Sequence, residues 1–226
     1  MDLRQLSKRL LFPLLKPLYR YYSTRTRSFR SHGLQVKVQP GVFHPGFFIS
    51  TRLLMDFLLE QGALKGRRFL ELGAGSGMVS LLAAREGARA TASDLSEAAI
   101  ANLKLNAQHT ALPLEVVHSD LFENLSDRQF DLLFINPPYY PKAPADEAEL
   151  AFYCGPEFEY FHRLFPQLHQ HVAPEGEVFM ILSEDCDLKT IPALARQYGW
   201  EWTTEKEIKR WGEWNYIFRL QSVAVV

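Results

Sequence analysis

The sequence predicts an α/β protein built on a doubly wound, mostly parallel sheet of seven strands with an antiparallel last strand. Three observations support this class. From residue 41 onward, short apolar runs of strand length alternate with amphipathic runs of helix length, the pattern of βαβ units. A glycine-rich turn at residues 73–77 joins one predicted strand to the next helix. Residues 201–225 are typical of two consecutive strands, which gives an antiparallel pair.

The length and composition fit one globular domain with a short appendage. The chain has 226 residues, of which 47% are hydrophobic and 23% charged, so disordered, collagen-like and coiled-coil classes are excluded. Its two cysteines, Cys154 and Cys186, have neither metal-ligand spacing nor the density of a disulfide scaffold. We therefore expect no metal site and a reducing, cytoplasmic location.

The net charge of −1 conceals two oppositely charged regions. Residues 1–40 contain nine Lys or Arg and one acid, whereas residues 41–226 contain 16 bases and 25 acids. We expect a basic, helical N-terminal extension over residues 1–40 and the main domain over residues 41–226. An apolar run at residues 10–15 is interrupted by Lys16 and Pro17, so it is too short to span a membrane. The extension is expected to pack on its own domain, with a membrane surface or a nucleic acid as the alternative partner.

The first half of the main domain predicts helices and strands in alternation. Ser50 or Thr51 is expected to cap a helix, because either hydroxyl can accept a bond from a free amide of the first turn. Ser96 has the same role for a later helix, and glycines end two of the helices. The elements predicted in order are a helix from residue 50 to Gly62, a strand at 68–72, a helix at 78–86, a strand at 90–94, a helix from Ser96 to about residue 108, and strands at 114–119 and 130–135.

The second half begins with a tetrapeptide that stops strand pairing. Neither proline of Asn136-Pro137-Pro138-Tyr139 can donate to a ladder, so the strand before it ends there. The elements predicted after it are a helix at 156–171, a strand at 177–182, a helix at 188–198 and the two strands within 201–225. The antiparallel pair is expected at the edge of the sheet.

An acidic, glycine-rich loop marks a binding site at the first strand of the main domain. The loop, Glu71-Leu72-Gly73-Ala74-Gly75-Ser76-Gly77, directly follows this strand. Glycines let the backbone turn tightly and approach a ligand where a Cβ would not fit. A dinucleotide fingerprint has a small residue three positions after its second glycine, where this chain has Met78. The loop therefore suits a ligand that brings an amino group and a carboxylate rather than a pyrophosphate.

Two aspartates follow at the ends of the next two strands. Asp94 ends the second strand, 21 residues after Gly73, where an acid can accept hydrogen bonds from ribose hydroxyls. Asp120 closes the third strand, where a carboxylate can accept from an adenine amino group. Because ligands of open α/β sheets bind along the carboxyl ends of the strands, the glycine loop and both acids predict a nucleoside site.

The tetrapeptide ends the fourth strand beside the same crevice and suits chemistry at a planar nitrogen. The lone pair of an amide or exocyclic amine is delocalised, so that nitrogen is a poor nucleophile. Acceptance of its two N–H bonds by the Asn136 side-chain oxygen and the Pro137 carbonyl would fix the nitrogen and stabilise its developing positive charge. The prolines stiffen the loop, and Tyr139 offers a flat face for a planar group.

These motifs together resemble the class I S-adenosylmethionine-dependent methyltransferases that act on nitrogen. Within that group the chain is most similar to the protein-(glutamine-N5) methyltransferases that modify translation release factors. The segment Asp120-Leu121-Phe122-Glu123, and Val42-Phe43-His44-Pro45 before the helix of Thr51, add to the resemblance, which covers residues 41–222. It implies a Rossmann-like methyltransferase fold and S-adenosylmethionine as the cofactor.

The motifs and the resemblance nominate a set of site residues. Catalytic roles are implied for Asn136, Pro137 and Tyr139. Cofactor contacts are implied for Thr51, Glu71, Gly73, Ala74, Gly75, Gly77, Asp94, Leu95, Asp120, Leu121 and Asn136.

Several acceptors for the methyl group stay open at this point. The resemblance favours a glutamine side chain of a protein, such as a release factor, methylated by a monomeric enzyme. The amino group of adenine or guanine in RNA or DNA is the alternative, because aromatic residues lie among the bases of residues 1–40 and suit a nucleic-acid contact. A small-molecule acceptor is a further candidate. A cofactor-binding protein without catalysis is disfavoured by the intact Asn136 and Tyr139.

Overall fold

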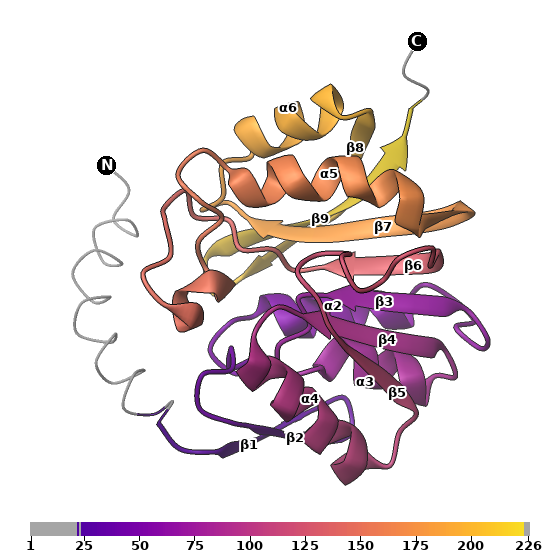
Figure 1. The fold of residues 1–226 in the computed structure, drawn as a ribbon, viewed down its shortest axis with the longest axis vertical. Helices are drawn as coiled ribbons and strands as arrows, with labels where there is room; N and C mark the ends of the chain where they lie inside the picture. Colours follow the sequence, from indigo (N-terminus) through magenta and orange to yellow (C-terminus); the bar gives the residue numbers. More distant parts are fainter. Residues whose placement is uncertain (1–21, 23, 224–226) are drawn as a thin grey trace.

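The computed structural model describes residue 22 and residues 24–223, and its centre is a seven-stranded sheet with the order β5-β4-β3-β6-β7-β9-β8 (Figure 1). The strands are β1 (Arg27–Ser31), β2 (Leu34–Val38), β3 (Arg68–Leu72), β4 (Arg89–Asp94), β5 (Leu114–His118), β6 (Phe130–Ile135), β7 (Val172–Ser183), β8 (Trp200–Arg210) and β9 (Glu213–Ser222). The helices are α2 (Ser50–Leu59), α3 (Met78–Arg85), α4 (Glu97–Thr110), the 3-10 helix η1 (Glu147–Ala151), α5 (Glu159–His171) and α6 (Thr190–Gln197). The predicted α/β class is confirmed.

The expected antiparallel pair at the edge of the sheet is confirmed: β9 and β8 are the last two strands in the order, with β9 between β7 and β8. Strands β3 to β7 pair in parallel, and β9 is antiparallel to both β7 and β8. The crossover through α6 keeps β8 in the same direction as β7, and β9 returns between them. A two-residue turn, Trp211–Gly212, joins β8 to β9, and both residues have positive φ (51° and 79°), as the right-handed twist of a hairpin requires.

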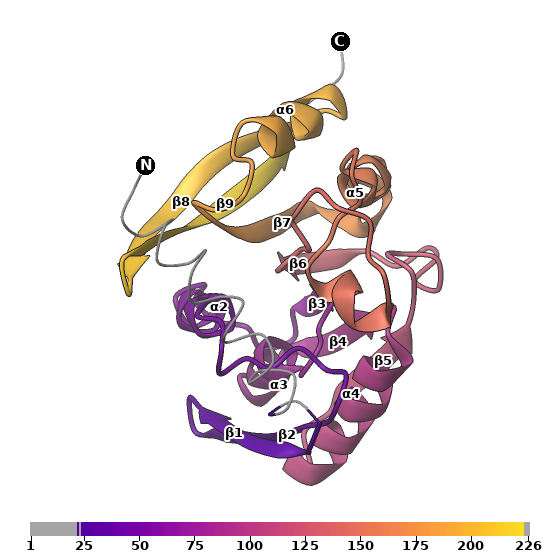
Figure 2. The same ribbon diagram turned by 90° about the vertical axis from the view of Figure 1, so that its left-hand side faces the viewer.

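The two faces of the sheet carry separate apolar cores. Phe69 of β3 and Phe134 of β6 belong to one, together with side chains of α2 and α3. Leu70 and Ile135, the next residues along the strands, belong to the other, against α5 and α6. Side chains of a strand alternate between faces, so central strands buried on both sides have continuous apolar sequences. Figure 2 shows α2 and α5 on opposite sides of the sheet.

The helix starts agree with the sequence at α4 but not at α2. Ser96 caps α4 by accepting a hydrogen bond from Ala99 N. The expected cap of α2 by Ser50 or Thr51 is wrong, because the helix already begins at Ser50, after Ile49, and no side chain caps it. The Ser50 hydroxyl instead accepts a bond from the side chain of Asn136, 3.2 Å away. Ser50 therefore binds the residue that follows β6 rather than capping its own helix.

The start of α5 and the termini of β7 also differ from the sequence prediction. The helix begins at Glu159, three residues later than expected, because Gly155 and Phe158 have positive φ values (89° and 59°) that end the preceding loop. Strand β7 begins directly after α5 at Val172, five residues earlier than expected. Among the described residues, no helix combines the length and the apolar character needed to cross a bilayer.

The N-terminal region contains a β-hairpin that was not predicted. Residues 27–38, expected to be helical, form the antiparallel pair β1 and β2. The expected helix over residues 1–21 lies outside the described residues, and the domain division at residue 40 stays a prediction. The hairpin packs on the domain: Val36 and Val38 are buried in the same core as α2 and α3.

Two buried asparagines of α4 hold β2 in place. Asn106 Oδ1 accepts from Lys37 N at 2.8 Å, and its Nδ2 donates to Lys37 O at 2.8 Å and to Ser76 O at 3.1 Å. Asn102 Oδ1 accepts from Gln39 N at 2.9 Å. The amides therefore pair with the open edge of β2 as a neighbouring strand would, and they tie the hairpin to the loop that contains Ser76.

We expect Asn106→Leu to lower the free energy of unfolding by about 3 kcal/mol, because it leaves the half-buried backbone amide and carbonyl of Lys37 without their partner. Urea denaturation measures the change. Lys104→Ala, on the exposed side of the same helix, is the matched control and should change stability by less than about 0.5 kcal/mol. Equal stability of the two variants would contradict this account of the hairpin.

Candidate active site

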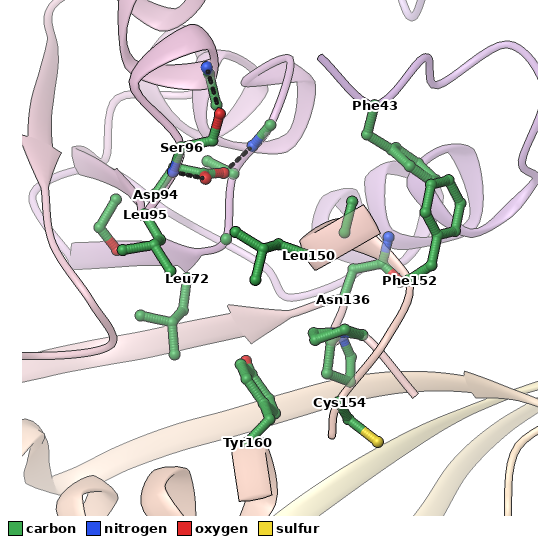
Figure 3. A pocket seen from close by; sticks show the side chains of 18 of the residues that line it. Phe43, Leu72, Asp94, Leu95, Ser96, Asn136, Leu150, Phe152, Cys154 and Tyr160 are labelled. Carbon is green, nitrogen blue, oxygen red and sulfur yellow. Dashed lines mark hydrogen bonds between the residues drawn. The ribbon is translucent and has the colours of Figure 1, made fainter. Parts of the chain in front are cut away.

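The carboxyl ends of the parallel strands line a cavity of about 340 Å³. The sequence-predicted residues meet there, although they come from α2, the glycine loop and the ends of three strands. Figure 3 shows Asp94 and Asn136 on opposite sides of this pocket. Its lining includes the predicted residues Thr51, Glu71, Gly73, Ala74, Gly75, Asp94, Leu95, Asp120, Leu121, Asn136, Pro137 and Tyr139.

Gly77 is the predicted residue that does not line the cavity. It takes the N-cap position of α3 with a φ of 78°. A Cβ on this residue would lie 2.5 Å from Leu103 Cδ2, so the glycine lets α4 pack closely against the loop. Gly73 differs: its φ is 72°, and a Cβ there would meet nothing within 4 Å, so its backbone faces open space.

The end of β4 fixes the shape of the glycine loop. Ser93 O accepts from both Gly73 N and Ala74 N at 2.9 Å. The Asp94 carboxylate accepts from Gly75 N through Oδ2 and from Ser96 N through Oδ1, each at 2.9 Å. Burial raises the pKa of Asp94, while these amides oppose the shift. Each carboxylate oxygen has two lone pairs, so Asp94 keeps capacity for a ligand hydroxyl.

Glu71 is a buried carboxylate at the end of β3. Its Oε2 accepts from Ser80 N at 2.8 Å, in the first turn of α3, so the strand supplies a cap to the helix that follows it. Burial raises the pKa of Glu71 to about 7, although the hydrogen bonds from Ser80 favour the charged form. The group can therefore exchange a proton near neutral pH.

Asp120 meets a partner that the sequence did not indicate. Its Oδ2 accepts a hydrogen bond from Arg163 of α5 at 2.7 Å, and Arg163 also lines the cavity. This ion pair spans from the end of β5 to α5 and holds one carboxylate oxygen. The other oxygen is left for a ligand donor.

Aromatic side chains close the remaining walls, and two of them, Phe152 and Tyr160, were missed by the sequence analysis. Phe43 stacks on Phe48 with ring centroids 4.3 Å apart, and both rings lie 5.7 Å from that of Phe152. Tyr160 of α5 projects into the pocket between its two sides (Figure 3). Phe152 belongs to the loop after the tetrapeptide, whose sequence has no periodicity, so nothing in the pattern placed it at the site.

The tetrapeptide is held rigidly beside these rings. Asn136 Nδ2 donates to Ser50 Oγ, which orients the amide. Tyr139 N and Tyr140 N both donate to Phe152 O, at 3.2 and 3.0 Å, so the loop folds back on the tetrapeptide. Burial and the neighbouring Tyr140 raise the pKa of the Tyr139 phenol, so Tyr139 stays neutral at physiological pH.

The titratable groups of the pocket are carboxylates and a thiol. Within the part of the chain that the structure describes, no group of three His, Cys, Asp or Glu side chains could hold a metal ion. Cys154 lines the cavity, but burial raises its pKa to about 11, so its nucleophilic thiolate form is scarce. Carboxylates surround one end of the pocket, and an oriented amide lies at the other.

Comparison with known proteins identifies the kind of domain. The model of the methyltransferase small domain family matches residues 33–207. Curated relatives include the release factor glutamine methyltransferase of Koribacter versatilis, 31% identical over 163 residues (66% of this chain, 58% of that protein). They also include the tRNA1(Val) (adenine(37)-N6)-methyltransferase of Shewanella halifaxensis, 32% identical over 143 residues (60% of this chain, 58% of that protein). The chain thus spans less than two thirds of the length of these relatives.

A solved structure supports the fold. The T. thermophilus 16S rRNA N2 G1207 methyltransferase, in complex with AdoMet and guanosine, superposes with a TM-score of 0.63 at 24% identity. The match covers 88% of this chain and 50% of that one.

The buried carboxyl of Glu71 makes the stability of the folded protein depend on pH, with stability falling as the pH rises. Burial raises the pKa of Glu71 from 4.5 to about 7, so the folded protein binds this proton more tightly than the unfolded chain. The stabilisation is full below pH 4.5 and is lost as the pH rises toward 7. Relative to Glu71→Gln, the wild type should lose up to about 3 kcal/mol across this window. Urea unfolding of both proteins at about pH 5, 6 and 7.5 tests this, and parallel pH profiles would contradict it.

Proposed function

Because the chain belongs to the methyltransferase small domain family and is an S-adenosylmethionine-dependent methyltransferase, we propose that it methylates a side-chain amide nitrogen of glutamine in a protein. The observation that carries the proposal is the tetrapeptide: Asn136 and Pro137 line the same cavity as the residues of the predicted nucleoside site. The acceptor class accords with relatives named as release factor glutamine methyltransferases.

The proposed cofactor site uses the carboxylate end of the pocket. Asp94 retains lone pairs for the ribose hydroxyls, and the free oxygen of Asp120 can accept from the adenine amino group. The open space over Gly73, which a side chain would fill, fits the amino acid portion of the cofactor near Glu71. When bound, S-adenosylmethionine supplies an electrophilic methyl group: the acceptor nitrogen forms a bond to this carbon as the sulfur–carbon bond breaks, leaving S-adenosylhomocysteine.

The proposed catalytic groups hold the acceptor nitrogen. Because Asn136 Nδ2 is engaged by Ser50, its Oδ1 is aimed as an acceptor, and the Pro137 carbonyl provides the second acceptor. These two hydrogen-bond acceptors hold the substrate nitrogen in place and stabilise the positive charge that it gains during methyl transfer. The nitrogen releases its proton after transfer, so the site needs no strong base. Ser50 is a positioning residue in this scheme.

The charge around the tetrapeptide favours a protein over a nucleic acid. The neighbouring segments 140–151, 184–186 and 209–214 contain six acids and three bases. We call the six acids the acidic rim; they are Asp146, Glu147, Glu149, Glu184, Asp185 and Glu213. Burial is the main cause of the raised pKa of the Tyr140 phenol, and the negative charge of Glu213 adds to it, so Glu213 lies close to Tyr140. Such a rim repels a phosphate backbone and accommodates a neutral or basic polypeptide.

The second candidate is methylation of a base in RNA. Relatives that act on tRNA and rRNA share the family, and one observation favours it here. The β1–β2 hairpin and the residues before it carry Arg25, Arg27, Arg30 and Lys37, a basic group suited to phosphates. The hairpin packs on α4, away from the acidic rim.

Methyl transfer into a cell extract tests the acceptor class. The enzyme is incubated with tritiated S-adenosylmethionine and an extract of cells that lack it, and portions are digested with protease or nuclease. Label released by protease, and recovered as methylglutamine after complete enzymatic digestion to amino acids, supports the proposal. Label released by nuclease assigns the RNA alternative.

Asn136→Ala should lower the turnover number at least about 100-fold, because an acceptor for the developing charge is lost. Cofactor affinity, measured by calorimetry, should change by less than about fivefold, since most cofactor contacts are elsewhere. Gln108→Ala removes an exposed amide of α4 and is the matched control. Retention of turnover in Asn136→Ala would refute the catalytic assignment.

Asp120→Ala should weaken S-adenosylmethionine binding about tenfold, equivalent to about 1.4 kcal/mol, through loss of the adenine contact. Glu123→Ala is the control, because Glu123 also faces Arg163, at 3.9 Å, but does not line the cavity. Titration calorimetry compares the two. Equal dissociation constants would mean that Asp120 serves only its ion pair.

A further inference from the structure

The turn of the β8–β9 hairpin presents an exposed tryptophan. Trp211 has 78% of its surface exposed. It also occupies the first position of the two-residue turn with a φ of 51°, where asparagine and glycine are the favoured residues. The indole contributes little to packing, and the turn would form more easily with another residue. The side chain is therefore unexplained by the fold.

The hairpin turn lies at the same end of the sheet as the tetrapeptide, where the parallel strands have their carboxyl ends. β7 ends at Ser183, opposite Asn215, and the hairpin continues for two further residue pairs, ending in Arg210 opposite Glu213. It therefore projects beyond the carboxyl ends of the parallel strands. Figure 2 shows the turn of β8–β9 and the loop between β6 and α5 on either side of the end of β6.

Direct contacts tie the hairpin to the loop after β7. Glu184 N donates to Trp214 O at 2.9 Å, and Trp214 N donates to Glu184 Oε1 at 3.2 Å. Lys209 lies over the ring of Trp214, 5.1 Å from its centroid. The base of the turn is thus fixed relative to the sheet, and Trp211 extends from a firm support rather than from a loose loop.

We propose that Trp211 anchors a polypeptide segment of the methyl-acceptor protein, whose glutamine enters beside Asn136. The inference rests on the proposed function and extends it from the reacting amide to the chain that carries it. A flat, exposed indole gives a large apolar contact at low entropic cost, which is how tryptophan acts at protein interfaces. Three acids of the rim, Glu184, Asp185 and Glu213, belong to the base of the hairpin and the loop bonded to it, and Asp185 and Glu213 are near enough to Tyr140 to act on its phenol. The occupant is therefore an apolar segment with flanking bases rather than a nucleic acid.

Trp211→Asn tests the anchor without endangering the fold, because Asn-Gly is a favoured sequence for this turn. The full-length variant is compared with wild type in transfer of tritiated methyl to the protease-sensitive fraction of the extract, at subsaturating extract concentration. We expect the initial rate to fall at least about tenfold. The dissociation constant of S-adenosylmethionine should not change, and the melting temperature should stay the same or rise. Leu59→Asn, at the far end of α2 and 45% exposed, is the matched loss of a surface apolar group and should keep the wild-type rate.

The outcomes separate this inference from the proposed function. If wild type labels protein and Trp211→Asn labels it equally fast, the anchor is refuted while the glutamine proposal stands. A weaker cofactor affinity in the variant would also refute it, since the effect would then be structural. If wild type labels only nuclease-sensitive material, the protein acceptor and its docking are both overturned.

Discussion

The end of β4 is the point on which the pocket depends. Backbone oxygen of Ser93 and both carboxylate oxygens of Asp94 take up four amide N–H groups, three from the glycine loop and one from the start of α4. Without these bonds the loop amides would be buried and unpaired, which is costly. The loop therefore takes its shape from a neighbouring strand, and the open space over Gly73 exists before any ligand arrives.

Acidic and basic residues are concentrated in different parts of the molecule. The acidic rim belongs to segments near the tetrapeptide, whereas Arg25, Arg27, Arg30 and Lys37 lie on and just before the β1–β2 hairpin, which α4 holds through Asn102 and Asn106. A nearly neutral chain thus presents two unlike faces. An acceptor that engages both has a preferred orientation set by long-range electrostatics before it makes contact.

The sequence predicted what depends on local pattern and missed what depends on distant pairing. Strands at 68–72 and 130–135 and the Ser96 cap are decided by burial on both faces and by a local hydrogen bond, and the structure has them at the expected positions. The β1–β2 hairpin was missed because bases alternate with its buried residues and favoured an extension. The antiparallel β8–β9 pair at the sheet edge was predicted, but the order within it, with β9 next to β7, follows from the crossover through α6 rather than from a local pattern. At the pocket, strand ends were predictable, whereas Phe152 and Arg163 meet it only through tertiary folding.

The strand order has a consequence for how such a domain can diverge. β3 has β4 on one side and β6 on the other, so the chain builds the sheet outward in two directions from β3. Residues 71–121 line the part of the pocket that we propose binds the nucleoside, and residues from 136 onward provide the tetrapeptide, the loop over it and the projecting hairpin. The two halves are consecutive in the chain and almost separate in space. Under the proposed function, exchange of the loop over the tetrapeptide and of the projecting hairpin between family members changes the methyl acceptor, while β3 to β5 and the Asp120–Arg163 pair keep the cofactor side.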